Sequence, residues 1–210
     1  INPMLSEDER KEATKGVKAG LDLLNELIEE KRSNPTDDFL STLILAEEEG
    51  EKLSNWEMCA LTGAVLAAGS DTAVDLHSYL IKALLSHPEQ LEELKQDEEL
   101  IQNAISETLR YESSGKTGLA RYVSEDMELL GVEVKKGQMI QLITSTAGLD
   151  PNTYDDPDTF DIHRNHDKSI SFGQGPHYCI GVTLVRSQTE VMLRELFNRF
   201  PNLSLSLIHI

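Results

Sequence analysis

The sequence predicts a mainly α-helical protein with a minor antiparallel β-sheet. Apolar residues recur at helical spacing through most of the first half of the chain and again near its end. Between these regions, short β-prone runs are separated by glycine turns. The 210 residues are enough for one large domain or two small ones, and they contain no internal repeat and no low-complexity linker.

The first two helices are predicted on either side of a break at "SNPTDD". Apolar residues at helical spacing predict a helix over residues 7–31. Pro35 ends that segment, and the next helix is expected over Phe39–Glu48, followed by a turn at Gly50.

A long helix is predicted at the centre of the chain. The sequence Ser54-Asn-Trp-Glu57 has the form of a capping box, in which serine and glutamate satisfy the first free N–H groups of a helix. The helix that it opens is expected over residues 55–87, on the order of 45–50 Å at about 1.5 Å per residue. Pro88 begins a short helix over residues 88–95, and Asp97 caps one that ends near Glu112.

The periodicity changes after these helices. Three β-prone runs, Met127–Leu130, Val132–Val134 and Met139–Thr144, predict a small antiparallel sheet. A loop-rich segment over residues 149–167 follows, and the last helix is expected from about Ile180 to Phe200.

Composition excludes several classes of protein. The net charge of −18 argues against nucleic acids and anionic membranes as general partners, because both attract basic surfaces. No apolar run reaches the roughly 20 residues of a bilayer-spanning helix. Cys59 and Cys179 provide no disulfide framework, which favours a reducing, cytoplasmic location.

Gly69, Asp71 and Thr72 interrupt the apolar centre of the long helix. A glycine inside a helix costs roughly 1 kcal/mol relative to alanine. One interpretation is a loosely packed helix crossing with a polar pair in solvent. The other is that Gly69 leaves room for a small ligand, Thr72 hydrogen-bonds into that room, and Asp71 supplies protons.

Glu107 and Arg110 lie three residues apart and therefore share one helix face. The pattern alone favours an exposed ion pair, worth about 0–1 kcal/mol.

The segment "SFGQGPHYCIG", residues 171–181, surrounds one cysteine with three glycines, a proline and a histidine. A lone cysteine is most often a small buried hydrophobic residue. Structural zinc is disfavoured, because only His177 lies at a suitable spacing from Cys179. A single thiolate ligand to haem iron fits better, since that ligand pushes electron density to the iron and favours O–O cleavage.

The rest of the loop suits that chemistry. Gly173 and Gly175 permit tight turns, and Gly181 lets the helix backbone approach a flat ring. Phe172 is expected to cover the sulfur of Cys179 from solvent. The start of the following helix favours a negatively charged sulfur.

These motifs together resemble a known family. "FGQGPHYCIG" is similar to the haem-binding signature of the cytochrome P450 family, with every defining position filled. "AAGSDT" resembles the oxygen-activating segment of that family's long central helix, and "ETLR" resembles its glutamate-x-x-arginine motif. The three occur in the family's order, and the likeness to soluble bacterial members extends along nearly the whole chain. It implies a cytochrome P450 fold.

The resemblance implies a role for each matching residue. Cys179 is the expected proximal ligand to the iron of haem b, and Thr72 is expected to hold the hydrogen-bond network at bound dioxygen. Asp71 is its partner in proton delivery, and Gly69 marks the groove for oxygen. His177 and Arg121 match the family's ligands to the haem propionates, where a cation meets a carboxylate.

The resemblance also changes the interpretation of Glu107 and Arg110, which are expected to be buried and structural. Thr159 stands where many members have an arginine as the third partner of this pair, and Arg164 is the nearest candidate for that place.

The chain is shorter than family members usually are, so residues 1–204 are expected to be the C-terminal portion of a single haem-thiolate domain. Residues 205–210, "LSLIHI", are what CTGTCTCTTATACACATC encodes, the end sequence of transposon-based sequencing libraries. We therefore expect them to be a non-native tail.

The leading functional interpretation is a haem-thiolate monooxygenase that hydroxylates or epoxidises a small organic substrate. Its electrons are expected to come ultimately from NAD(P)H through a separate ferredoxin or flavodoxin, docked near Arg186, Arg194 and Arg199. Two alternatives stay open: a haem-thiolate enzyme that uses peroxide, and a non-catalytic or incompletely folded haem-binding fragment.

Overall fold

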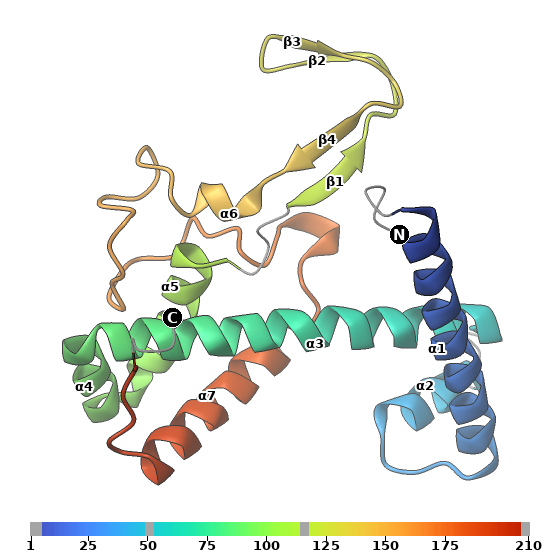
Figure 1. The fold of residues 1–210 in the computed structure, drawn as a ribbon, viewed down its shortest axis with the longest axis horizontal. Helices are drawn as coiled ribbons and strands as arrows, with labels where there is room; N and C mark the ends of the chain where they lie inside the picture. The colour runs from blue at the N-terminus through green and yellow to red at the C-terminus, as the bar shows by residue number, and fades with distance from the viewer. Residues whose placement is uncertain (1–5, 49–52, 114–117, 207–210) are drawn as a thin grey trace. The chain divides into compact units, whose positions relative to one another are not determined.

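The computed structural model describes residues 6–48, 53–113 and 118–206, and Figure 1 shows the order of their helices and strands. The chain divides into two compact units, residues 1–70 and 71–210. The predicted mainly helical class with little β-structure is confirmed. The predicted turn at Gly50 lies outside the described residues.

The first unit contains α1 (Glu7–Ser33), α2 (Phe39–Glu48) and the beginning of α3 (Asn55–Ser86). Ser6 and Glu9 form a capping box at the start of α1, which the sequence analysis did not identify. A small core of buried residues joins the three helices: Ile28, Ile44, Met58 and Cys59.

The capping box predicted for α3 is confirmed. The Ser54 N–H donates to Glu57 Oε2 at 2.9 Å, and the Glu57 N–H donates to Ser54 Oγ at 3.3 Å. The predicted bounds of α1, α2 and α3 agree with the structure to within two residues.

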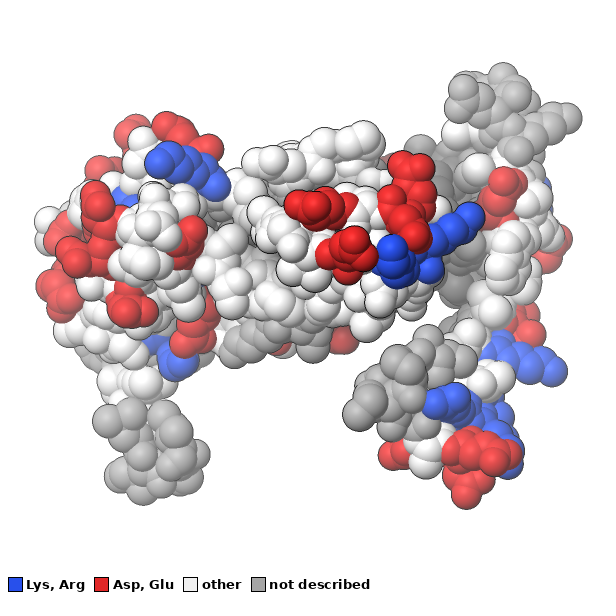
Figure 2. All heavy atoms as spheres, turned by 90° about the horizontal axis from the view of Figure 1, so that it is seen from above, with Lys and Arg blue, Asp and Glu red and all other residues white. Residues whose placement is uncertain are grey.

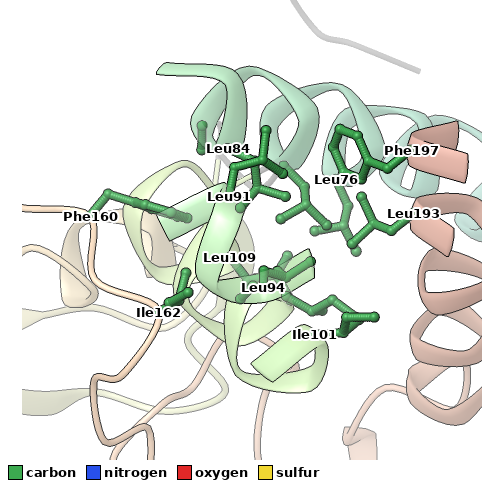
Figure 3. Packing of buried hydrophobic residues seen from close by; sticks show 14 residues of the cluster. Leu76, Leu84, Leu91, Leu94, Ile101, Leu109, Phe160, Ile162, Leu193 and Phe197 are labelled. Atoms are coloured by element: carbon green, nitrogen blue, oxygen red, sulfur yellow. The ribbon is translucent and has the colours of Figure 1, made fainter. Parts of the chain in front are cut away.

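The second unit is built on the end of α3, α4 (Pro88–Gln96), the 3-10 turn η1 (Glu98–Leu100), α5 (Ile101–Tyr111) and α7 (Val182–Arg199). Asp97 caps η1, as predicted, by accepting the N–H of Glu99. Figure 3 shows the apolar side chains of these helices pointing toward one another, together with two from the loop before α7. The labelled members of this core are Leu76, Leu84, Leu91, Leu94, Ile101, Leu109, Phe160, Ile162, Leu193 and Phe197.

The β-structure differs from the prediction of one sheet. β1 (Leu119–Tyr122) pairs antiparallel with β4 (Met139–Leu142), and β2 (Met127–Leu129) pairs separately with β3 (Val132–Val134). β1 was not predicted, because its four residues, Leu-Ala-Arg-Tyr, do not alternate between apolar and polar. The chain then enters the short helix α6 (Thr144–Ala147), so Thr144 does not belong to a strand.

Leu130 was predicted to end a strand but lies in the β2–β3 turn. Its φ of +52° and that of Gly131, +82°, match the left-handed residues of a two-residue hairpin turn.

Acidic side chains are more frequent than basic ones on the face drawn in Figure 2, and a broad area of that face carries neither. Within the described ranges, no helix combines the length and the apolar character that a membrane crossing requires.

Candidate functional site

The loop that carries Cys179 is folded by its own backbone. The N–H of Gly173 donates to Ile170 O at 2.8 Å, and the N–H of Tyr178 donates to Gly175 O at 3.0 Å. The N–H of Cys179 then reaches back to Phe172 O at 2.9 Å. The loop therefore closes on itself immediately before α7 begins.

Two glycines in this loop are required by the backbone. Gly173 and Gly175 have φ values of +76° and +72°, in the left-handed region that side chains other than glycine rarely adopt. Gly175 begins the 3-10 turn η2 (Gly175–His177). Gly181 has an ordinary φ of −81°, so its conformation does not explain a glycine there.

A Cβ on Gly181 would lie 3.8 Å from Cys179 Sγ, an ordinary van der Waals distance, so no described atom excludes a larger residue there. The glycine does leave the volume next to the thiol open. Cys179 itself is exposed, and the next residue, Ile180, is 96% exposed. One thiol on an open, apolar face fits a flat, apolar ring that takes a single thiolate ligand.

Phe172 does not by itself cover the sulfur of Cys179 from solvent. Its ring is half-buried and packs against the core of the second unit. Cys179 remains exposed, so the expected protection of the sulfur by Phe172 is not achieved within the described residues.

His177 and Arg121 are exposed and lie on η2 and β1. Among the described residues, the Arg121 side chain donates to the carbonyl of its neighbour Ala120, at 2.9 Å. Neither side chain has an ion-pair partner among the described residues, so both keep the capacity to bind an anionic group. No measured contact joins either side chain to Cys179.

The middle of α3 is exposed on all sides. Every residue from 64 to 72 is exposed, including Gly69, Asp71, Thr72 and the apolar Leu66, which is 61% exposed. A Cβ on Gly69 would meet nothing within 4 Å. Residues 64–69 are apolar or glycine, and apolar helix surface of this kind is normally buried, but no described residue covers it here.

Glu107 and Arg110 form a buried ion pair. Their side chains are 0% and 1% exposed, and Arg110 holds both carboxylate oxygens through Nε and Nη2 at 2.7 Å each. The remaining donors of Arg110 reach the carbonyls of Gly148, Pro157 and Thr159 at 2.6–2.8 Å. All five N–H groups of this guanidinium are thereby satisfied.

Glu107 has further partners in the loop that precedes Cys179. Its Oε1 accepts the N–H of Asp161 at 2.9 Å and the Nε–H of Arg164 at 3.3 Å. Arg164 also donates to three carbonyls between residues 155 and 159. Arg164 is thus the third member of the cluster in space, while Thr159 contributes only its carbonyl.

His166 joins this cluster and was not identified from the sequence. Its side chain is 9% exposed, and Nε2 lies 3.6 Å from Glu107 Oε2. Neither ring nitrogen has a hydrogen-bond partner among the described residues. Burial lowers the pKa of His166, and the charges of Arg110, Arg164 and Arg186 lower it further, against the opposing effect of Glu107.

A second histidine links α3 to α7 and was also missed. Thr189 Oγ1 donates to Val185 O at 2.6 Å and therefore accepts from His77 Nε2, 3.0 Å away. Burial lowers the pKa of His77. No local sequence signal marks either histidine, because His77 is placed by the packing of α3 against α7 and His166 by the packing of its loop against Glu107.

The three arginines expected to receive a redox partner differ in their surroundings. Arg194 pairs with Glu98 and Glu190, and Arg199 pairs with Glu195. Arg186 is half-buried and bonds to neutral acceptors of α5. The surface of α7 therefore carries less free positive charge than the sequence suggests.

The family model for Cytochrome P450 matches residues 2–205. The chain belongs to the cytochrome P450 family. The epothilone C/D epoxidase of Sorangium cellulosum is 38% identical over 95% of the chain and 48% of its own length. The polyketide biosynthesis cytochrome P450 PksS of Bacillus subtilis is 35% identical over 96% of the chain and 50% of its own length.

Solved cytochrome P450 structures share the fold. Epothilone B-bound P450epoK superposes with a TM-score of 0.85 at 39% identity, over 90% of the chain and 48% of that structure. Cytochrome P450 CREJ in complex with (4-ethylphenyl) dihydrogen phosphate gives a TM-score of 0.88 at 30% identity, over 96% and 50%. The chain spans about half the length of the curated relatives that it matches.

Proposed function

We propose that the protein is a haem-thiolate monooxygenase, in which Cys179 is the ligand to the iron of haem b. The observation that carries the proposal is the exposed thiol of Cys179, held by a 2.9 Å backbone hydrogen bond at the start of α7 beside the space left by Gly181. The family implies the same cofactor.

When bound, haem supplies the activation of O₂. As the ligand, the Cys179 sulfur would carry one negative charge close to the first turn of α7, where a helix dipole favours an anion. Gly173 and Gly175 hold the left-handed turns that place this cysteine. His177 and Arg121 supply exposed donors suited to the two propionates.

We assign proton handling to α3. The carboxylate of Asp71 is exposed and forms no hydrogen bond or ion pair with a described residue, so it is available to exchange protons with water and pass them to the hydroxyl of Thr72. Gly69 leaves open space beside the helix, which would suit a small ligand. The exposed apolar residues of this stretch, Val65 and Leu66, are suited to an apolar ring or substrate.

The names of the relatives support the proposed substrate class. Their names include an epoxidase and a hydroxylase of 6-deoxyerythronolide B, which supports a small organic substrate and insertion of one oxygen atom. Balance then requires O₂, two electrons and two protons per product and water. We assign the electrons to NAD(P)H through a ferredoxin or flavodoxin.

Haem titration with a matched cysteine pair tests the ligand. The reduced, CO-treated wild-type protein and Cys59→Ser are expected to give the thiolate-typical band, because Cys59 is buried in the first unit, where its thiol donates to Asn25 Oδ1. Cys179→Ser is expected to lose that band. The same spectrum from all three proteins would refute the proposed ligand.

Reconstituted turnover tests α3. Thr72→Ala and Asp71→Asn are expected to divert electrons to peroxide and to lower product formation by about 10²-fold or more, as loss of a proton-transfer group does. Ser70→Ala is the matched control, since Ser70 is exposed and its hydroxyl donates to Ala67 O in the preceding turn of the same helix. Equal coupling of electrons to product in all three variants would exclude this role.

A further inference from the structure

Arg186 is a half-buried cation in the second turn of α7. Its Nη1 donates to Gln102 O at 3.1 Å and to Gln102 Oε1 at 3.2 Å. Its Nη2 donates to Ser106 Oγ at 2.9 Å. Both partners belong to α5, so this one side chain binds the two helices together.

The acceptors of Arg186 are all neutral. Within the described ranges no carboxylate lies in ion-pair distance of it, although Arg194 and Arg199 of the same helix each pair with glutamate. A partly buried charge without a counter-ion is costly to desolvate. Arg186 is therefore poorly explained as a surface cation of α7.

The guanidinium of Arg186 also lies over the ring of Phe172. Its central carbon lies 5.4 Å from the centroid of the ring, within the range of a cation–π contact. Phe172 is also the residue whose carbonyl accepts the N–H of Cys179. A continuous series of contacts thus runs from α5 through Arg186 and Phe172 to Cys179.

Ser106, Phe172 and Arg186 also line a pocket of about 140 Å³, together with Tyr178 and others. The loop is therefore not packed solidly against α5 at this point. Arg186 supplies hydrogen bonds to α5 and a ring contact to Phe172 beside this pocket.

We propose that Arg186 is a positioning residue for Cys179, which clamps Phe172 to α5 and so holds the residue 172–181 loop in a fixed place. The importance of this position for haem rests on the proposed function, but the clamp itself does not. Arg186 acts through Phe172, since no contact of the guanidinium with Cys179 is measured.

Amide hydrogen exchange of the protein without added haem tests the clamp. Arg186→Met removes the donors and the charge at similar length, and we expect the N–H of Cys179 to exchange about tenfold faster or more, because hydrogen bonds from a charged group are lost. The N–H of Val123, which donates to Gln138 O at 3.0 Å in the same unit, is expected to keep its rate. Arg199→Met removes a charge from the exposed end of α7 and should leave both rates unchanged.

Arg186→Lys separates charge from geometry. Lysine keeps the charge but lacks the planar fork that reaches Gln102 and Ser106 together, so an intermediate rate is expected at Cys179. This variant also decides the question if the methionine variant does not fold.

A Cys179 rate equal to wild type in folded Arg186→Met or Arg186→Lys would overturn the clamp. An equal acceleration at Val123 would also overturn it, because general destabilisation would then suffice. Failure of the wild-type protein to bind haem would refute the proposed function and leave these exchange rates interpretable.

Discussion

Replacing Glu107 with glutamine removes one charge from the most enclosed ion pair of the protein. Glu107→Gln keeps the shape of the side chain and one carbonyl oxygen. Both carboxylate oxygens of Glu107 accept hydrogen bonds from Arg110 at 2.7 Å. The NH₂ group of glutamine would therefore face an N–H donor of Arg110 where the wild-type protein has an acceptor. Arg110, 1% exposed, then has no full counter-charge, because Glu107 is its only ion-pair partner in the described residues.

The expected loss of stability follows from this burial. Removing one member of a buried ion pair costs about 3–5 kcal/mol, because the other charge remains in a medium that solvates it poorly. The three carbonyls around Arg110 reduce the cost without replacing the charge. Against a total stability of about 5–15 kcal/mol for an ordinary domain, a loss of about 4 kcal/mol is a large fraction.

Urea denaturation followed by circular dichroism measures the difference. The matched control is Glu92→Gln, because Glu92 pairs with Lys95 at 2.6 Å with the same three-residue spacing but is 63% exposed. An exposed pair of this kind contributes about 0–1 kcal/mol. If Glu107→Gln lost no more stability than Glu92→Gln, the structural role assigned to the buried pair would be wrong.

Three further predictions concern the same unit. Gly173→Ala should cost about 1 kcal/mol or more in the same denaturation assay, because φ is +76° there, whereas alanine at Gly181, with φ −81°, should cost less. The folded-state pKa of His166 lies below its ordinary value of 6.5, so the unfolded chain binds the proton first and the stability of the fold should decrease as the pH drops below about 6.5. His166→Leu should weaken this pH dependence of stability between about pH 7.5 and about pH 5.5. An unchanged slope of stability against pH would contradict the argument that burial lowers this pKa. Cys179→Ser should leave the denaturation midpoint unchanged because the thiol is exposed, and a large shift would mean that the loop packs differently.

Much of the helical framework could be predicted because its signals are local. Apolar spacing and the Ser54–Glu57 capping box fixed α3 to within a residue, and Pro88 gave the start of α4. β1 could not be found in this way, because its stability comes from pairing with β4: Leu119 lies opposite Leu142, 23 positions later. Strand pairing over such distances is not visible in four residues of sequence.

The candidate site also combines features that have a local sequence signal with features that depend on distant parts of the chain. The spacing of Glu107 and Arg110 places them on one face, but their burial depends on carbonyls 38–49 residues away in the chain. The pattern alone therefore favoured an exposed pair, and only the family resemblance suggested a buried one. Arg186 shows the reverse case: it looked like a surface cation by its place after Cys179, yet it turns toward α5.

α5 explains why these features occur together. Gln102 and Ser106, four residues apart, face Arg186 and so support the loop of Cys179. Asn103 and Glu107, also four apart and displaced by one residue, face the chain at residues 161–164: Asn103 donates to the carbonyls of Ile162 and Arg164. One short helix thus holds both ends of the segment that leads to the thiol, each through a different face.

A substitution on one face of α5 should therefore leave the contacts of the other face intact. Glu107→Gln should accelerate amide hydrogen exchange at the Asp161 N–H more than at the Cys179 N–H. Arg186→Met should accelerate exchange at the Cys179 N–H more than at the Asp161 N–H. If both variants accelerated both amides equally, α5 would act as a single cooperative unit and the division into two faces would be wrong.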